Sequence, residues 1–294
     1  MTQEYGGVII PMVTPFNEDQ ELDTGALRRL CSYLIESGVH GLFPFGSTGE
    51  FFALTPEEKE RILDVVVEEA AGRVMVYAGT GAVSTKEAIR LAQMAEAHGA
   101  DGLCVITPFY LTPSSEELYE HYLAITQSTH LPVLCYNNPN RTGVNVSVDV
   151  IARLAETENF VGIKDSSGDV SLTAQYVVNT PPDFAVIQGR DDLFYPSFVV
   201  GTVGAVAATG NVVPELVVEI YEAFMAGEWE RALAAQTRLS QLRRALSLGT
   251  FPVVIKEAMA IRGNPAGPSR LPVKPLAETQ RARLRAILTD MEVL

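Results

Sequence analysis

The chain has 294 residues, of which 47% are hydrophobic and 20% are charged, and its formal net charge at pH 7 is −14. That length allows one large hydrophobic core or two ordinary ones. The negative charge argues against nucleic acid and anionic membranes as partners, although single arginines can still bind small anionic substrates.

Cysteine and histidine usage argues against further classes of protein. The three cysteines lack Cys-x-x-Cys spacing and the four histidines are scattered, so we expect no disulfide framework, no metal and no cofactor. The first residues lack the basic and apolar regions of a signal peptide, and no apolar run approaches the length of a membrane span. These features are typical of a soluble, cytoplasmic protein.

Short apolar segments alternate with amphipathic helical segments along the chain. Eight segments are predicted as strands because they are apolar and bounded by turn residues. They are residues 7–10, 41–45, 74–78, 102–106, 132–136, 161–164, 184–187 and 204–207. Side chains suited to N-capping precede four of the helical segments, namely Asp23, Thr55, Ser84 and Ser114.

Eight strand–helix units without a break in composition favour a closed (β/α)8 barrel, the TIM-barrel fold, over residues 1–226. A doubly wound sheet of six or seven strands is the alternative, but it would leave units unused. From about Gly227 onward the strand patterns stop and helical patterns continue. Residues 227–294 are therefore predicted to form a helical C-terminal extension packed on the barrel, with a loop over residues 265–275.

One of the five lysines, Lys164, lies where a catalytic amine would be placed. It closes the apolar residues 160–163 and precedes the polar turn 165–169, so a buried strand would deliver its side chain to the strand end. Burial favours the neutral form of an amine, which makes a lysine there costly unless it has a partner or does chemistry. Lys256 is the only rival, but the helical spacing around it predicts that it leaves the apolar face and extends to solvent.

Barrel enzymes carry their chemistry at the carboxyl ends of the strands. At or just after those ends the sequence has a set of polar residues and glycines: Gly46, Ser47, Thr48, Tyr110, Tyr136, Arg141, Lys164, Ser166 and Gly189. Lys164, Tyr136, Tyr110 and Ser47 are the candidate catalytic residues, and the others are candidate substrate-binding residues. The set contains no histidine or carboxylate cluster, which argues against a divalent metal. It suits carbonyl chemistry through an imine, in which a lysine amine attacks a ketone and hydroxyl groups relay protons.

Each motif alone also has a purely structural explanation. Residues 46–50 could be a plain turn and helix cap, the two tyrosines could pack at the barrel rim, and Arg141 could be a surface residue. A phosphate site after the last strands is a further alternative, but no basic residue follows Gly210 until Arg231. The motifs favour one site because all of them fall at strand ends of a single expected architecture.

Together these residues resemble the dihydrodipicolinate synthase / N-acetylneuraminate lyase superfamily of pyruvate-dependent class I aldolases, over nearly the whole chain. Four motifs carry the resemblance, in the right order and at strand ends: Gly46-Ser47-Thr48-Gly49-Glu50, Thr107-Pro108-Phe109-Tyr110, Tyr136-Asn137 with Pro139, and Ile163-Lys164-Asp165 with Gly168-Asp169. The resemblance implies that Lys164 forms a Schiff base with pyruvate and that Tyr136 is the general acid/base. It also implies that Ser47 and Thr48 hold the pyruvate carboxylate. Tyr110 would complete the proton relay, often across a tight dimer interface within a homotetramer.

The resemblance leaves the second substrate open. Arg141 matches the synthase branch, where this arginine receives the carboxylate of aspartate semialdehyde in a reaction of lysine biosynthesis. Ser47, the pair Phe51-Phe52 and Leu111 depart from that branch. We expect 4-hydroxy-tetrahydrodipicolinate synthase activity, with a 2-keto-3-deoxy sugar acid aldolase or dehydratase, or an N-acetylneuraminate lyase-like enzyme, as alternatives. A non-enzymatic regulatory homologue is opposed by the intact candidate catalytic residues.

Overall fold

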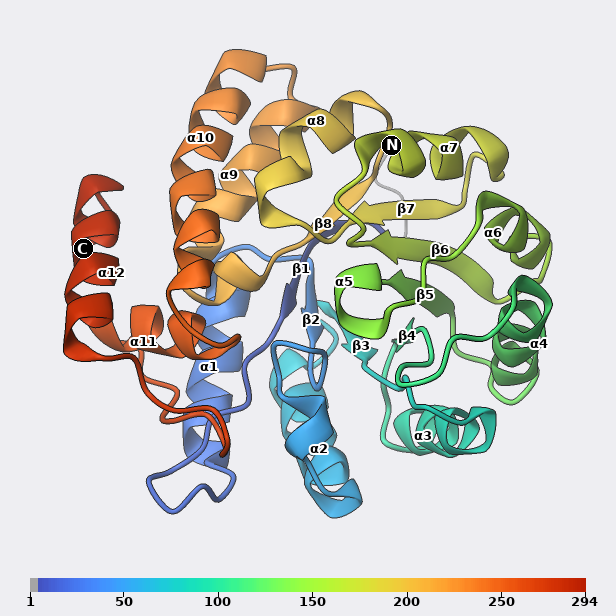
Figure 1. Cartoon of the computed structure of the whole chain (residues 1–294), viewed down its shortest axis with the longest axis horizontal. Helices are drawn as coiled ribbons and strands as arrows, with labels where there is room; N and C mark the ends of the chain where they lie inside the picture. Colours follow the sequence, from blue (N-terminus) through green and yellow to red (C-terminus); the bar gives the residue numbers. More distant parts are fainter. Residues whose placement is uncertain (1–4) are drawn as a thin grey trace.

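Eight parallel strands form a closed barrel in the computed structural model, which describes residues 5–294 (Figure 1). The strands are β1 (Gly7–Pro11), β2 (Gly41–Phe43), β3 (Met75–Ala78), β4 (Gly102–Ile106), β5 (Val133–Asn137), β6 (Phe160–Asp165), β7 (Ala185–Gln188) and β8 (Gly204–Val206). Each strand pairs with the next in sequence, and β8 closes the ring by pairing with β1. The predicted (β/α)8 barrel is therefore confirmed.

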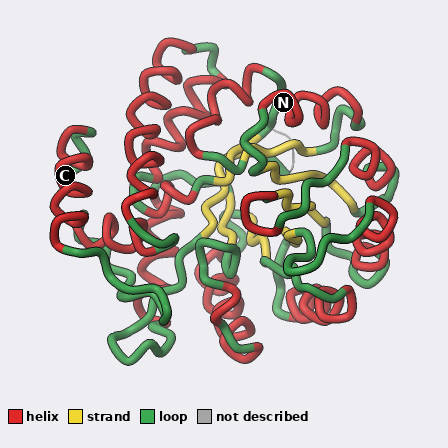
Figure 2. Tube along the Cα trace, viewed as in Figure 1, coloured by secondary structure: helices red, strands yellow, loops and turns green. Residues whose placement is uncertain are grey.

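Helices surround the central strands (Figure 2). Those of the barrel are α1 (Thr24–Glu36), α2 (Pro56–Ala70), α3 (Thr85–Ala97), α4 (Ser115–Thr126), α5 (Pro139–Thr142), α6 (Val148–Leu154), α7 (Val170–Asn179), α8 (Phe194–Val199) and α9 (Pro214–Met225). All four predicted N-cap side chains accept a hydrogen bond from the first turn of their helix, and Thr55 and Ser114 form complete capping boxes. Within residues 5–294, none of the helices has the length and apolar character needed to cross a bilayer.

The second strand is shorter than predicted. The sequence predicts residues 41–45, but β2 ends at Phe43 because Pro44 has no N–H for the ladder and Phe45 adopts a φ of +39°. The early end of this strand begins the turn that carries Ser47 and Thr48.

Three further helices follow the barrel, as the sequence predicts: α10 (Trp229–Ala245), α11 (Val253–Ile261) and α12 (Glu278–Asp290). They lie together at one side of the barrel, where α10 packs against α9 (Figure 1). The predicted loop over residues 265–275 connects α11 to α12.

The prediction for Lys256 is wrong. Its side chain does not extend to solvent: it is 2% exposed, and its Nζ lies 2.7 Å from Oε1 of the buried Glu50. Burial lowers the pKa of this amine to about 8, and the nearby Glu50 carboxylate opposes that shift. The helical spacing placed Lys256 correctly on a helix, but it could not reveal that a carboxylate from a distant turn lies opposite the amine.

Candidate active site

Lys164 and Tyr136 lie side by side on neighbouring strands. The register of β5 and β6 pairs their Cα atoms, so both side chains point to the same face, the interior of the barrel. Nζ of Lys164 lies 3.7 Å from the centre of the Tyr136 ring and 5.0 Å from that of Phe43. Lys164 is 4% exposed, and no carboxylate in residues 5–294 forms an ion pair with it. The amine is therefore available to a bound ketone.

The next residue on each strand points outward and holds this pair in place. Nδ2 of Asn137 donates to Oδ1 of Asp165 at 3.0 Å, and Oδ2 of Asp165 accepts from Oγ1 of Thr173 at 2.6 Å. Asn137, Asp165 and Thr173 are completely buried. Satisfied hydrogen bonds between buried polar groups order the ends of both strands, and thereby the positions of Tyr136 and Lys164.

The Tyr136 hydroxyl has a second polar neighbour. It accepts a hydrogen bond from Nδ2 of Asn138 at 2.8 Å. Because the hydroxyl accepts from this amide, its own proton remains to be donated elsewhere. This arrangement suits a general acid and base that serves a group bound at Lys164.

A turn over residues 46–50 brings two hydroxyls to the same place. Ser47 and Thr48 lie at its tip, and Thr48 is 3% exposed. Oγ1 of Thr14 donates to the backbone oxygen of Gly49 at 2.6 Å, which ties the turn to the segment that follows β1. Hydroxyls and backbone N–H groups presented in this way can bind a carboxylate.

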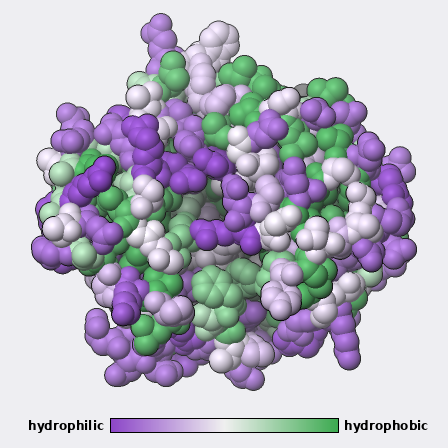
Figure 3. Space-filling model, viewed as in Figure 1, coloured by the Kyte–Doolittle hydropathy of each residue, from purple (hydrophilic) through white to green (hydrophobic). Residues whose placement is uncertain are grey.

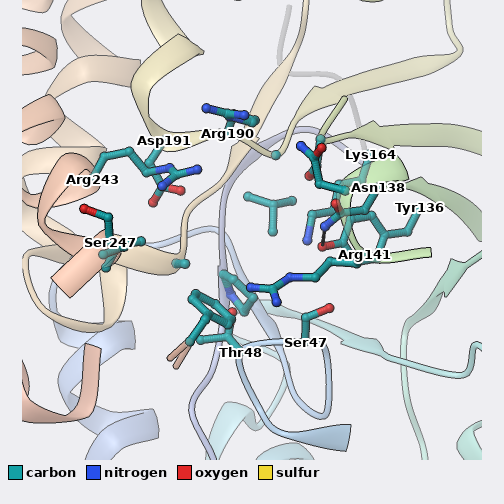
Figure 4. A pocket seen from close by; sticks show the side chains of 18 residues that line it. Ser47, Thr48, Tyr136, Asn138, Arg141, Lys164, Arg190, Asp191, Arg243 and Ser247 are labelled. Atoms are coloured by element: carbon teal, nitrogen blue, oxygen red, sulfur yellow. Dashed lines mark hydrogen bonds between the residues drawn. The ribbon is translucent and has the colours of Figure 1, made fainter. Parts of the chain in front are cut away.

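These side chains open into one cavity of about 330 Å³ at the carboxyl end of the strands (Figure 4). In the space-filling view there is a hollow at the centre of this face, with hydrophilic side chains around it (Figure 3). Seven of the nine predicted site residues line the cavity: Ser47, Thr48, Tyr136, Arg141, Lys164, Ser166 and Gly189. Gly46 borders a smaller cavity instead, and Tyr110 lines neither.

Gly189 leaves room for the amine. A Cβ atom at this position would lie 2.0 Å from Oγ of Ser166 and 3.0 Å from Cε of Lys164. Any other residue would therefore displace the serine or the lysine. The strand end itself is held by the Gly189 N–H, which donates to the backbone oxygen of Asp165 at 2.7 Å.

Arg141 reaches the cavity from the short helix α5. This helix is held to the end of β4 because Oγ1 of Thr107 donates to Oγ1 of Thr142 at 3.0 Å. The Arg141 guanidinium lies 5.0 Å from the centre of the Phe251 ring, and it forms no ion pair with any residue that the structure describes. It can therefore receive an anionic group of a substrate.

Tyr110 does not contact the cavity of its own chain. Its side chain is 99% exposed, and its φ of +76° lies in the left-handed region that non-glycine residues rarely adopt. Tyr110 is therefore not part of the cavity that the other candidate residues form within one chain.

The far wall of the cavity consists of residues that the sequence analysis did not assign. Arg190, after β7, and Arg243, in α10, both approach Asp192, at 3.2 Å and 3.7 Å. Burial would raise the pKa of Asp192, but its hydrogen bonds with Arg190 and the two positive charges hold that pKa below its usual value. Ser247 lies on the same side, opposite Lys164 (Figure 4).

The helix α10 reaches the cavity through contacts with the segment after β7. Nε2 of Gln236 donates to the backbone oxygen of Asp191 at 2.9 Å, while Oδ1 of Asp191 accepts from the N–H and hydroxyl of Thr209 at 2.7 and 2.6 Å. Neither Arg243 nor Ser247 had a sequence signal: Arg243 lies on α10, which has only the pattern of a surface helix, and Ser247 lies in the short 3₁₀ helix Leu246–Leu248 that follows it.

The chain matches the dihydrodipicolinate synthetase family over residues 4–291. An uncharacterized DapA-like lyase of Halobacterium salinarum is 41% identical over 288 residues, which cover 98% of this chain and 94% of the relative. A 4-hydroxy-tetrahydrodipicolinate synthase of Methanothrix thermoacetophila is 39% identical, with 99% and 98% covered. The crystal structure of a prophage protein of the dihydrodipicolinic acid synthase family from E. coli K12, in complex with pyruvate, gives a TM-score of 0.96 at 33% identity and covers 99% of this chain and 100% of that chain. This chain therefore belongs to the dihydrodipicolinate synthetase family.

Proposed function

We propose that this chain is a lyase of the class I aldolase type, which forms a Schiff base between Lys164 and pyruvate. The observation that carries the proposal is the buried Lys164 amine, which lies beside the Tyr136 ring and has no carboxylate partner among residues 5–294. Nζ attacks the ketone carbon of pyruvate, water leaves, and an iminium ion forms. Loss of a proton from the methyl carbon gives an enamine. That carbon then bonds to the carbonyl carbon of an aldehyde, whose oxygen takes up a proton. The iminium ion that re-forms is cleaved from Nζ by water, or by the amino group of the product, which frees Lys164.

The lining residues take roles that fit this sequence of steps. Tyr136 moves the protons, with its hydroxyl oriented by Asn138. Ser47 and Thr48 bind the carboxylate of pyruvate, supported by the backbone of the turn that begins at Gly46. Ser166 and Gly189 bound the space beside Lys164 and bind the substrate there.

The best-supported second substrate is aspartate semialdehyde, which would make the chain a 4-hydroxy-tetrahydrodipicolinate synthase. Several relatives that carry this name are 39% to 40% identical to the chain over nearly its full length. The Arg141 guanidinium supports the assignment because it faces the cavity without an ion-pair partner in the described residues. It would receive the carboxylate of the aldehyde.

A second candidate is the cleavage of 2-keto-3-deoxy sugar acids into pyruvate and a hydroxyaldehyde. The observation in its favour is the far wall of the cavity, where Arg190 and Arg243 add guanidinium groups beyond Arg141 and Ser247 adds a hydroxyl oxygen. A hydroxylated chain would engage these groups.

Two experiments test the chemistry and choose the substrate. Pyruvate with borohydride should trap an adduct on the peptide that contains Lys164, and Lys164→Ala should abolish it; trapping on Lys256 would contradict the assignment. A coupled assay should then compare pyruvate plus aspartate semialdehyde with a panel of 2-keto-3-deoxy acids. Faster turnover of a panel member would replace the synthase assignment with the second candidate.

We further propose a homotetramer of tight dimers, in which Tyr110 of the partner subunit enters the cavity and completes the proton relay. The exposed Tyr110 side chain and its left-handed backbone support this arrangement. Tyr110→Ala and Lys164→Ala should each inactivate the protein when expressed alone. When they are co-expressed, about a quarter of the sites should combine an intact lysine with an intact tyrosine from the other subunit. Mixed assemblies without activity would show that Tyr110 does not act across the interface, and an active Tyr110→Ala variant would place it outside the relay.

A further inference from the structure

A buried ion pair joins the turn of residues 46–50 to the C-terminal helices. Nζ of Lys256 in α11 lies 2.7 Å from Oε1 of Glu50, and the two side chains are 2% and 0% exposed. The amine also donates to the backbone oxygen of Pro268 at 2.8 Å, and Oε2 of Glu50 accepts from the Arg270 N–H at 3.0 Å. Both charged groups thus have protein partners, although neither reaches solvent.

Such a pair is a poor means of gaining stability. Removing two charges from water costs several kcal/mol each, and well-packed apolar residues in their place are often as stable or more so. A buried pair is better explained by the geometry that it fixes. Glu50 itself adopts φ 55° and ψ 38°, a left-handed conformation that a non-glycine residue keeps only when its surroundings enforce it.

The Glu50–Lys256 ion pair fixes the position of the turn that carries Ser47 and Thr48. Thr14 holds this turn from the barrel side through the backbone oxygen of Gly49, and Lys256 holds it from the α11 side through Glu50. Neither member of the ion pair lines the cavity, whereas both hydroxyl residues do.

We propose that Glu50 and Lys256 are positioning residues, which hold Ser47 and Thr48 where they bind the carboxylate of pyruvate. The proposal rests on the function proposed above. Positioning of this kind affects binding, because hydrogen bonds to a carboxylate weaken steeply when the donors leave their favoured distance and angle. The same pair fixes the start of α11, and the segment just before α11 carries Ser247 and Phe251 on the other wall of the cavity.

Removing the charges one at a time and then together separates positioning from stability. Glu50→Gln keeps the side-chain shape and an oxygen for the Arg270 N–H, and Lys256→Met keeps most of the aliphatic chain. Each single variant leaves one buried charge unpaired and should lower the melting temperature. The double variant leaves none, so it should regain most of the lost melting temperature.

The decisive measurement is the pyruvate concentration that gives half-maximal borohydride trapping on Lys164. In the double variant we expect it to rise about tenfold to a hundredfold, the scale of one lost hydrogen bond to a charged group, while the adduct formed at saturating pyruvate stays close to the wild-type level. Glu257→Gln is the matched control. Glu257 follows Lys256 on α11, and the substitution breaks its ion pair with Arg281 of α12. This control should leave the half-saturating concentration unchanged.

A refolded double variant with wild-type half-saturation would overturn the proposal and leave the pair a purely structural role. If the double variant does not fold, Glu50→Asp tests the same point, since it keeps the charge but withdraws the carboxylate by one methylene. A wild-type value for that variant would also overturn the proposal. Failure of the wild-type protein to form any adduct on Lys164 would instead refute the proposed function.

Discussion

Tyr136→Phe separates the acid–base role of the phenol from its packing. The substitution removes a hydroxyl that accepts one hydrogen bond, from Nδ2 of Asn138 at 2.8 Å, and it keeps the ring beside Lys164. The side chain is 5% exposed, and its apolar contacts inside the barrel remain. Asn138 lines the open cavity, where water can replace the lost acceptor. We therefore expect the free energy of unfolding to change by less than about 1 kcal/mol.

The effect on catalysis should be much larger. General acid–base assistance is typically worth about 10² to 10⁴-fold, which corresponds to about 3 to 5 kcal/mol of transition-state stabilisation. Two assays on the same preparation show which step loses rate. The first measures turnover with pyruvate and the second substrate, and the second measures how fast the borohydride-trapped adduct forms in a single turnover. Both rates should fall, because loss of water from the amine–ketone adduct and loss of a methyl proton each require proton transfer.

Tyr122→Phe is the matched control for this experiment. The Tyr122 hydroxyl is also buried, but it donates to the backbone oxygen of Val105 at 3.0 Å and lies outside the cavity. We expect this variant to lose about 1 to 2 kcal/mol of stability, because a buried acceptor loses its partner, and to keep wild-type turnover. Turnover of Tyr136→Phe within about threefold of wild type, or an equal loss in Tyr122→Phe, would refute the acid–base role.

Two further predictions concern binding and acid stability. Arg141→Ala should lower kcat/KM for an anionic second substrate by an amount equivalent to about 1.5 to 3 kcal/mol of transition-state stabilisation. Pyruvate trapping should stay intact, since the guanidinium would bind only the second substrate. Equal damage to both would assign Arg141 a structural role. Burial lowers the pKa of His121 to about 4, so between pH 6.5 and 4 the unfolded chain binds a proton that the folded chain does not. The free energy of unfolding should therefore fall by about 3 kcal/mol across that interval, and His121→Gln should remove this slope in urea titrations at each pH. An unchanged slope in the variant would assign it to other groups.

The parts of the fold that the sequence predicted depend on local patterns. The strands are short apolar runs, and helices such as α2 and α4 begin at side chains that cap them, so neither inference required knowledge of distant residues. The neighbouring positions of Lys164 and Tyr136 also followed, because consecutive strands pair in a barrel and both residues end a strand.

The errors and omissions involve partners that are distant in the sequence. Lys256 was expected at the surface because its helix gives no sign of Glu50, which is about two hundred residues earlier in the chain. Arg243 was missed because α10 reaches the cavity through Gln236 and the backbone of Asp191, a tertiary contact without a local signature. Charged side chains whose partners come from elsewhere in the fold are the residues that periodicity alone cannot place.

The two walls of the cavity are held by different kinds of contact, and this divides their roles. Lys164 and Tyr136 lie on paired strands whose ends are ordered by the buried Asn137 and Asp165, so the geometry for forming an imine belongs to the barrel. Arg243 belongs to α10, which packs on α9 through buried apolar side chains such as Leu239 and Leu242 and contacts the segment after β7 through Gln236. Changes in the extension can therefore alter which second substrate fits without disturbing the amine and its phenol neighbour.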